Sequence, residues 1–383
     1  METTDSGPSP TGKLLENALD ECIRSFDGNY DGDPSEIDGN YPRNLHRVTS
    51  KWITWCGKRE THTLEDVSVR TMQRYASHLE QRVRAKQADS SKGISASSAW
   101  TYYNYISAFL SWAVRWEYLA ENPAEKERAK KEMPSRSTSN SGDQQFWQPE
   151  QRRAIMDYVD EQAREAIDAD GMDAFEQVRN RALLAVLAYT GVRGAELLAD
   201  SRDSRRNGIR WGDVDLEDGY LDVLGKSQDE EETALPEQAV EPLRRLETLL
   251  MPPNEDWPVF PSRHPPSLYD AIDNSEHDRP DGNPWEFVLE RDIKPPSMSK
   301  SGARTLMKRL SKEADVPLED SPKDYLTLHG ARRGVGEKLY REHGAAASQR
   351  TLRHADPQTT SEMYSHIEAS ELAEDNTEVF ENE

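Results

Sequence analysis

A segment near the C-terminal end of the chain, residues 326–366, gathers the residue types that phosphoryl chemistry needs. His329 stands three residues before Arg332, and His354 stands ten residues before Tyr364. Arginine binds phosphate with a bidentate fork and keeps its charge, so it can replace a metal ion beside a phosphoryl group. Histidine can transfer protons, and tyrosine can attack phosphorus as a nucleophile. The segment therefore indicates phosphoryl chemistry without a metal.

Two upstream cations would complete such a site. Arg193 follows Gly191 at the end of an apolar helix and begins the next helix, so its charge should face outward from a rigid core. Glu196 can hold the start of that helix or pair with Arg193. Lys226 lies on a predicted hairpin turn, from which its flexible side chain can reach a departing 5′ oxygen as a general acid. Cleavage of a phosphodiester needs such a proton donor, charge balance and an aligned nucleophile.

Each of these residues alone has an ordinary structural explanation. A glycine that ends a helix before a surface arginine is common, and a turn lysine is usually solvated. A lone histidine or tyrosine is more often structural than catalytic. A tyrosine with its usual pKa of about 10 is also a weak nucleophile unless cations flank it, although its phosphate ester conserves the bond energy. The candidate site therefore depends on the whole ordered set.

The sequence lacks the motifs of several other phosphate enzymes. It contains no HExxH, no DxDxDG loop and no metal-ligand pairs, and Cys22 and Cys56 fit small apolar helix residues better. It also contains no GxxxxGK[ST] motif for nucleotide phosphates, so we expect no metal and no cofactor. No signal peptide and no membrane-length apolar run is present, so we expect a cytoplasmic protein without a membrane partner.

The composition is strongly acidic. The 383 residues carry 48 Lys and Arg against 71 Asp and Glu, a formal net charge of −23. Disorder would fit this charge, but 9 Trp, 14 Tyr and periodic apolar segments indicate a folded protein of two or three domains. An acidic surface with more Arg than Lys is typical of a halophilic protein. At face value the acidity argues against a nucleic-acid partner, which requires clustered basic residues.

Apolar residues at helical spacing predict a four-helix module in the first third of the chain. Its helices are expected at residues 14–26, 45–55, 63–86 and from 95 to a stop signal at 121–123. The aromatic stripe of the fourth helix, which includes Tyr102 and Phe109, is interpreted as core rather than as a base-stacking platform. The expected divisions are a disordered tail at 1–10, the helical module at 11–131, a serine-rich linker at 132–145 and a second module at 146–383.

The second module is predicted to be mainly α-helical with a small antiparallel sheet. Helices are expected at residues 149–163, 182–189, 302–314, 329–343, 346–353 and 358–366. Short strands are expected at residues 209–211, 220–224 and 233–235, with a turn at 225–227. Residues 264–300 are rich in Pro, Asp and Asn and are predicted to form a long loop or insertion. An acidic tail follows at residues 371–383.

In their order along the chain, the candidate residues resemble the signature of the tyrosine recombinase (phage integrase, Xer-like) family. The order is Arg193 in TGxR, Lys226 on a hairpin, His329-x-x-Arg332, His354 after Arg353, and Tyr364 after a Thr-Thr pair. The likeness covers nearly the whole chain. The helical module resembles the family's SAM-like core-binding domain, which binds DNA, and residues 146–383 resemble its catalytic domain.

The resemblance implies a site-specific DNA recombinase, or integrase, that cuts and rejoins DNA without metal or ATP. Tyr364 would form a 3′-phosphotyrosine link. Arg193 and Arg332 would clamp the scissile phosphate, and His354 would hydrogen-bond one of its non-bridging oxygens.

The resemblance also implies proton carriers and partners. His329 would assist proton transfer from the tyrosine, and Lys226 would protonate the departing 5′-hydroxyl. Four protomers would act on two DNA duplexes, so the implied partners are double-stranded DNA with a specific site and further copies of the chain. Accessory DNA-bending proteins would be additional partners, and the protein would associate with the nucleoid. With the acidic composition, the resemblance indicates a haloarchaeon, or its virus or plasmid, as the source.

Two features depart from the family's pattern. Arg353 replaces the usual glycine before His354, where it would add a phosphate contact or stiffen the turn. Four acids at residues 229–232 would repel DNA unless high salt or an outward orientation relieves the repulsion. Two rival functions stay open. One is a type IB topoisomerase, whose family tends to carry lysine where His329 stands, and the other is a non-catalytic DNA-binding protein on a decayed recombinase scaffold.

Overall fold

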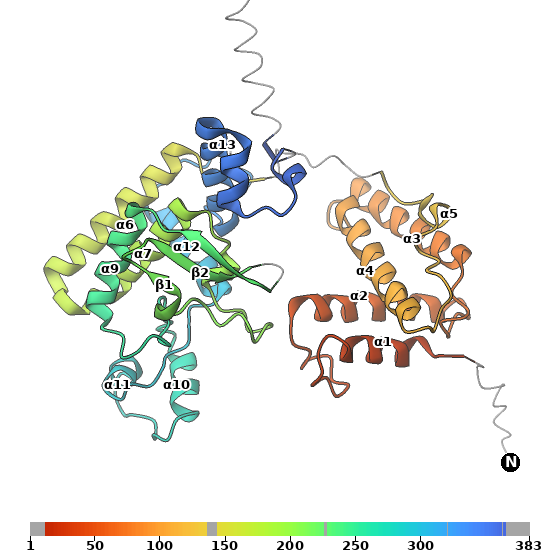
Figure 1. The fold of residues 1–383 in the computed structure, drawn as a ribbon, viewed down its shortest axis with the longest axis horizontal. Helices are drawn as coiled ribbons and strands as arrows, with labels where there is room; N and C mark the ends of the chain where they lie inside the picture. The colour runs from red at the N-terminus through yellow and green to blue at the C-terminus, as the bar shows by residue number, and fades with distance from the viewer. Residues whose placement is uncertain (1–11, 136–143, 226–227, 320, 362, 365–383) are drawn as a thin grey trace, which may run out of the picture. The chain divides into compact units, whose positions relative to one another are not determined.

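The computed structural model divides the chain into two compact units (Figure 1). The first contains residues 1–139 with 202–204, and the second contains residues 140–201 with 205–383. The described residues are 12–135, 144–225, 228–319, 321–361 and 363–364. The predicted tails at 1–10 and 371–383, residues 136–143 of the predicted linker and Lys226 lie outside them. Within the described ranges, no helix is both long and apolar enough to cross a membrane.

Over its described residues, the first unit is built from four long helices and one short helix. They are α1 (Leu15–Arg24), α2 (Asn40–Gly57), α3 (Val69–Ala88), α4 (Ala96–Arg115) and α5 (Glu127–Lys130). The stripe of α4 is core, because Phe109 and its neighbours Ile106 and Leu110 are fully buried. The third helix begins later than predicted. The Asp66 carboxylate accepts the backbone N–H of Thr63 in a turn, and the helix is capped by Ser68 instead.

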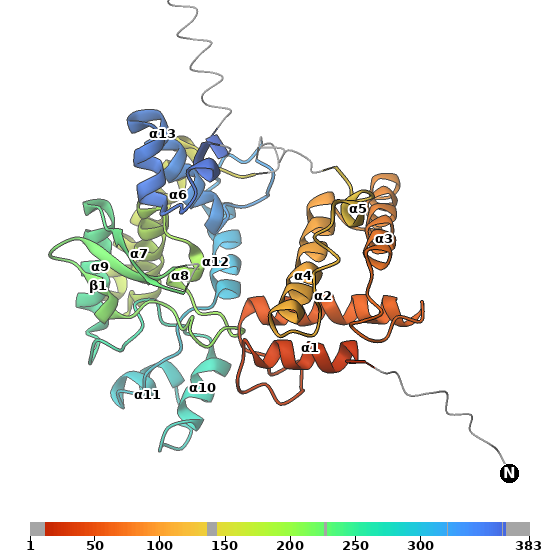
Figure 2. The ribbon, with the colours of Figure 1, turned by 45° about the vertical axis from the view of Figure 1, so that its right-hand side comes forward.

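A helix that is buried almost all round forms the centre of the second unit. The sequence predicted a buried stretch at residues 182–189 of α7 (Phe175–Thr190). Residues 182–188 are apolar and all seven are buried, whereas Tyr189 at the end of the stretch is only partly buried. The helices α6 (Pro149–Asp170), α9 (Glu237–Leu250) and α13 (Leu328–Leu352) pack against α7 (Figure 2). α13 contains a non-helical residue, Gly344, which accounts for the two separate helices predicted there.

A three-stranded antiparallel sheet lies beside these helices. Its strands are β1 (Val214–Asp215), β2 (Tyr220–Leu224) and β3 (Glu230–Ala234), in the order β1-β2-β3. In the β2–β3 pair, Val223 lies opposite Glu231. The strand predicted at residues 209–211 is wrong, because Arg210 makes only an isolated bridge to Pro258 and residues 211–213 form a 3-10 turn.

The long loop predicted at residues 264–300 is also wrong over much of its length. It contains α10 (Pro265–Asp273) and α11 (Pro284–Glu290), each with a proline in its first turn, where the missing N–H costs nothing. Trp285 of α11 is buried and stacks on Phe175 with ring centroids 4.9 Å apart. These helices therefore belong to the packed core of the second unit.

Two more helices belong to the second unit. They are the one-turn helix α8 (Gly194–Leu197) and the helix α12 (Lys300–Glu313). The predicted fold class, mainly α-helical with a small antiparallel sheet, is confirmed.

We expect the core around α7 to dominate the stability of the second unit. Leu187 is fully buried, so Leu187→Ala should lower the free energy of unfolding by about 2–5 kcal/mol. Leu289 on α11 is 36% exposed, and Leu289→Ala should change the free energy of unfolding by about 0.5 kcal/mol or less. Urea denaturation followed by circular dichroism measures both values, and similar losses in the two variants would contradict this placement of the core.

Candidate active site

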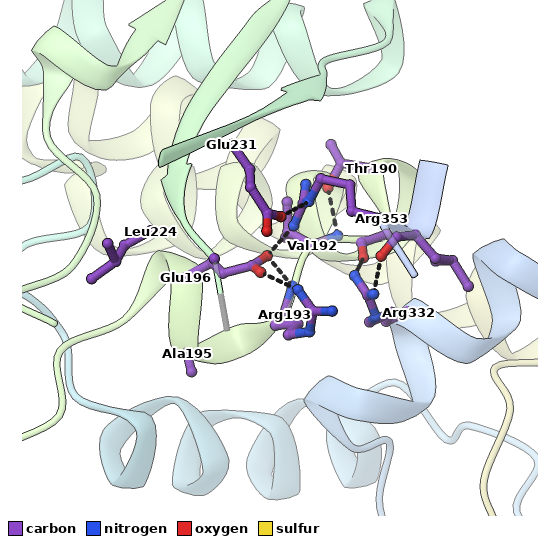
Figure 3. Close-up of polar contacts among 12 residues, drawn as sticks. Thr190, Val192, Arg193, Ala195, Glu196, Leu224, Glu231, Arg332 and Arg353 are labelled. Atoms are coloured by element: carbon purple, nitrogen blue, oxygen red, sulfur yellow. Dashed lines mark hydrogen bonds and ion pairs between the residues drawn. The ribbon is translucent and has the colours of Figure 1, made fainter. Parts of the chain in front are cut away.

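Arg193 is held at the junction between α7 and α8. The helix α7 ends at Gly191, whose φ of 74° is the left-handed conformation that glycine adopts without strain. Arg193 then caps α8, and Glu196 reaches back to it. One Glu196 carboxylate oxygen accepts the backbone N–H of Arg193 at 2.7 Å, and the other accepts its guanidinium at 2.6 Å. Both roles predicted for Glu196 are therefore found together (Figure 3).

Glu196 is a buried anion between two arginines. Its carboxylate also accepts Arg353 Nη2 at 2.5 Å, and only 1% of its side chain is exposed. Burial alone would raise the pKa of Glu196, but the charge of Arg353 and the hydrogen bonds from Arg193 hold that pKa below its usual value. Glu196 is therefore ionised at neutral pH and fixes both guanidinium groups.

The start of α13 is braced by the segment that precedes α6. The hydroxyl of Thr327 caps the helix by accepting the N–H of Gly330 at 3.0 Å. The Gln145 side chain accepts the N–H of Thr327 at 2.6 Å, and the indole of Trp147 donates to the Thr327 carbonyl at 3.0 Å. These bonds set the position of the helical turn that carries His329 and Arg332.

Arg332 joins three segments that are far apart in sequence. Its side chain is almost completely buried. Nη1 donates to the carbonyl of Gly191 at 2.6 Å, and Nη2 donates to the carbonyl of Leu352 (Figure 3). Burial and the charge of Arg193 lower the pKa of Arg332, but a guanidinium stays charged at neutral pH. The protein thus maintains two arginine cations at one place.

Both candidate histidines lie in the field of these cations. Burial, together with the charges of Arg332 and Arg193, lowers the pKa of His354 to about 4. Burial and neighbouring arginines also lower the pKa of His329 to about 4. His354 Nδ1 is 2.9 Å from the hydroxyl of Thr360. The two imidazoles are therefore neutral at pH 7, so each has one nitrogen that can accept a hydrogen bond or a proton.

Tyr364 is fully buried against α13. Its ring lies 5.3 Å from that of Tyr340 and 6.2 Å from that of Phe146, measured between centroids. The hydroxyl donates to the Arg333 carbonyl at 3.4 Å and lies beside Gly336, where a Cβ would come within 2.1 Å of it. Burial raises the pKa of Tyr364. The phenol is therefore protonated in this position.

The structure thus brings five of the six predicted residues into one region. Arg193 comes from the α7–α8 junction, His329 and Arg332 from the start of α13, and His354 and Tyr364 from the segment that follows α13. The sixth, Lys226, lies outside the described residues. Fixed cations can balance the charge of a phosphodiester. The neutral imidazoles can transfer protons during its cleavage, and the phenol can serve as the nucleophile.

Sequence reasoning missed two residues around the site. Glu231 on β3 accepts Arg353 Nε at 2.8 Å. Arg206 donates to the carbonyls of Ala195 at 3.2 Å and Leu224 at 2.9 Å. The alternation of side chains along β3 could have indicated that Glu231 and Glu232 face opposite ways. No pattern in the sequence indicated Arg206.

Comparison with known proteins agrees with this geometry. The model of the phage integrase family matches residues 146–371, and that of the phage integrase SAM-like domain matches residues 38–131. The tyrosine recombinase XerC of Chlorobaculum parvum (strain DSM 263 / NCIMB 8327) is 36% identical over 100 residues, which cover 25% of this chain and 27% of the relative. That of Xanthomonas axonopodis pv. citri (strain 306) is 27% identical over 195 residues, 50% of this chain and 54% of the relative. The chain thus spans about half the length of the curated relatives it matches, or less.

A solved structure shares the fold over nearly all of the chain. The XerH site-specific recombinase bound to its palindromic difH substrate, in a post-cleavage complex, superposes with a TM-score of 0.54. The alignment covers 96% of this chain and 98% of that chain at 14% identity, so it shows the fold alone. The family model, in contrast, matches more than half of the sequence and includes the whole candidate site. The chain therefore belongs to the phage integrase family of tyrosine recombinases.

Proposed function

We propose that this protein is a site-specific DNA recombinase that cuts and rejoins double-stranded DNA through a 3′-phosphotyrosine intermediate. The observation that carries the proposal is the pair of fixed cations, the partly exposed Arg193 and the buried Arg332, beside two neutral histidines and Tyr364. Among the described residues, Glu196 forms ion pairs with Arg193 and Arg353, and Glu231 forms an ion pair with Arg353. A bound phosphodiester would add the anion that this region favours.

The proposed reaction assigns a role to each group. Tyr364 Oη attacks the scissile phosphorus and loses its proton to His329, which is neutral and can accept it. Arg193 and Arg332 balance the charge on the non-bridging oxygens as the pentacoordinate state forms. The bond from phosphorus to the 5′ oxygen then breaks, and that oxygen receives a proton. Attack by a 5′-hydroxyl of a second strand reverses these steps and releases the tyrosine.

Lys226 and His354 complete the proposed site. Lys226 supplies the proton to the departing 5′ oxygen, as its place in the hairpin sequence predicts. His354 donates a hydrogen bond to a non-bridging oxygen. Because Tyr364 is buried and bonded to the Arg333 carbonyl, the segment after His354 has to move before the phenol can reach phosphorus. DNA binding would supply the free energy for this movement.

The proposal extends to partners and conditions. The helical unit before the linker binds DNA together with the catalytic unit, and four copies of the chain assemble on two duplexes, with accessory DNA-bending proteins where the site requires them. The protein acts in the cytoplasm at the nucleoid of a haloarchaeon, or on its virus or plasmid. The net charge of −23 supports this, because a strongly acidic protein binds DNA more readily where salt screens their repulsion.

The covalent step can be tested with a library of nicked duplexes that have randomised centres. We expect the protein to form an SDS-resistant adduct with a subset of these duplexes, and Tyr364→Phe to abolish it because the nucleophile is lost. Tyr158→Phe removes only an exposed contact with Glu313 and should leave the adduct unchanged. An adduct that survives Tyr364→Phe would contradict the assignment. Site-independent relaxation of supercoiled plasmid would favour a type IB topoisomerase instead.

The depressed pKa of His354 predicts how stability depends on pH. The unfolded histidine titrates at about 6.5, whereas the folded one titrates at about 4. Between these values the unfolded chain binds more protons, so stability falls as pH falls. We expect His354 to account for a loss of about 1 kcal/mol between pH 7.5 and 5.5.

Urea denaturation at the two pH values measures this loss. His354→Asn should lose correspondingly less stability than the wild type on acidification. His343→Asn, at an exposed position of α13, should behave as the wild type does. Equal pH dependence in all three proteins would show that His354 is not held neutral by its surroundings.

The halophilic proposal predicts a salt requirement. Repulsion among unscreened carboxylates should destabilise the fold in dilute buffer, and molar KCl should relieve it. We expect the midpoint of thermal unfolding, measured by circular dichroism, to rise steadily as KCl increases from dilute to molar concentrations. A folded, fully stable protein in dilute buffer would contradict adaptation to high salt.

A further inference from the structure

Arg353 connects two anions that belong to different parts of the catalytic unit. Its Nη2 donates to Glu196 at 2.5 Å, and its Nε donates to Glu231 at 2.8 Å. Only 11% of the Arg353 side chain is exposed. Glu196 in turn binds Arg193. A continuous chain of charged contacts therefore runs from the cation at the α7–α8 junction to strand β3 (Figure 3).

Glu231 carries this connection to the end of the β2–β3 hairpin. Its carboxylate lies against Gly225, where a Cβ would come within 2.3 Å of a carboxylate oxygen. Arg206 holds the same end of β2, because its guanidinium donates to the carbonyls of Leu224 at 2.9 Å and Gly225 at 2.7 Å. The end of β2 and the following Gly225 are thus fixed from both sides, and Lys226 is the next residue in the sequence.

The backbone of Arg353 is held in a conformation that its side chain does not favour. Its φ of 52° and ψ of 51° are left-handed and are adopted most readily by glycine. Glycine would satisfy this turn without strain but would remove both ion pairs. A strained residue held by its surroundings is a reason to look for a function of its side chain. Here the visible effect of that side chain is to connect the hairpin to Glu196.

A direct contact with phosphate is the other role that Arg353 could have. Two of its three guanidinium nitrogens already donate to carboxylates, and Nη1 is buried without a hydrogen-bond partner. The occupied nitrogens favour a bridge between protein groups over a phosphate ligand. The two roles predict different responses to the leaving group, so a kinetic experiment can separate them.

We propose that Arg353 is a positioning residue that couples the β2–β3 hairpin to the arginine clamp through Glu231 and Glu196. The inference rests on the proposed recombinase function. Arg353 would set where the hairpin presents its general acid relative to the phosphate that Arg193 holds. Loss of the coupling should therefore slow protonation of the departing 5′ oxygen more than it weakens the binding of the phosphate.

The test compares two substrates that differ in one atom. A duplex selected by adduct formation with the wild type is made with either oxygen or sulfur at the 5′ bridging position. A thiolate leaves without being protonated, so sulfur removes the need for a general acid. We expect Arg353→Gly and Glu231→Gln to form the adduct about 10- to 100-fold more slowly on the oxygen substrate. On the sulfur substrate they should react nearly as fast as the wild type.

Two reference variants define the limits of this experiment. Glu232→Gln removes the same charge from an exposed neighbouring position, and it should leave both substrates unaffected. Lys226→Ala should show the selective loss on oxygen in its strongest form. The double variant Arg353→Gly/Glu231→Gln should be no slower than the slower single variant, because both changes break one connection.

Each outcome bears on the proposal. Selective rescue by sulfur in both variants supports a positioning role. Equal losses on the two substrates would overturn it and would indicate a phosphate contact or a general loss of structure, and unchanged rates would overturn it as well. Glu231→Gln keeps the shape of the side chain, so the test does not depend on Arg353→Gly alone. If the selection yields no duplex that forms an adduct with the wild type, the recombinase function itself is refuted instead.

Discussion

The guanidinium of Arg332 is the group on which the candidate site depends most. By donating to the carbonyls of Gly191 and Leu352, it joins the end of α7, the start of α13 and the segment that leads to Tyr364. A buried cation of this kind is costly to desolvate, and loss of its partners would leave it uncompensated. The same residue that the chemistry needs therefore also assembles the three segments that supply the other groups.

The electrostatics of the site depend on burial and on the carboxylates that contact these arginines. Glu196 is ionised, binds Arg193 and Arg353, and is itself buried. Burial, together with the charges of the nearby arginines, keeps His329 and His354 neutral, with pKa values of about 4. The strongly acidic composition of the chain therefore does not predict the local charge at the site. The local charge is set by a few fixed contacts, whereas the net charge describes the chain as a whole.

Much of the fold and of the candidate site could be predicted from the sequence where one local pattern sufficed. The all-apolar stretch of α7 required burial, and the order of the candidate residues indicated a divided phosphate site. The errors arose where contacts between residues far apart in sequence determine the local structure. The segment containing α10 and α11 has the composition of a loop, yet Trp285 packs on Phe175 far away in sequence. Likewise, residues 209–211 have strand-like side chains, but they pair with residues 257–259 only through an isolated bridge and its two backbone hydrogen bonds.

The role of Arg353 could not be predicted for the same reason. Its partners, Glu196 and Glu231, lie 157 and 122 residues away. The acids of the hairpin suggested only repulsion of DNA, whereas one of them, Glu231, binds the largely covered side chain of Arg353. Sequence shows that a residue departs from its family's pattern, but the contact that compensates for the departure becomes visible only in three dimensions.

The most direct measurement of the central claim is peptide mapping of the DNA adduct. The trapped complex would be digested with nuclease and protease, and the peptide that retains a nucleotide would be sequenced by mass spectrometry. The account predicts a nucleotide joined through its 3′ phosphate to Tyr364. A nucleotide on another residue, or one joined through its 5′ phosphate, would contradict it.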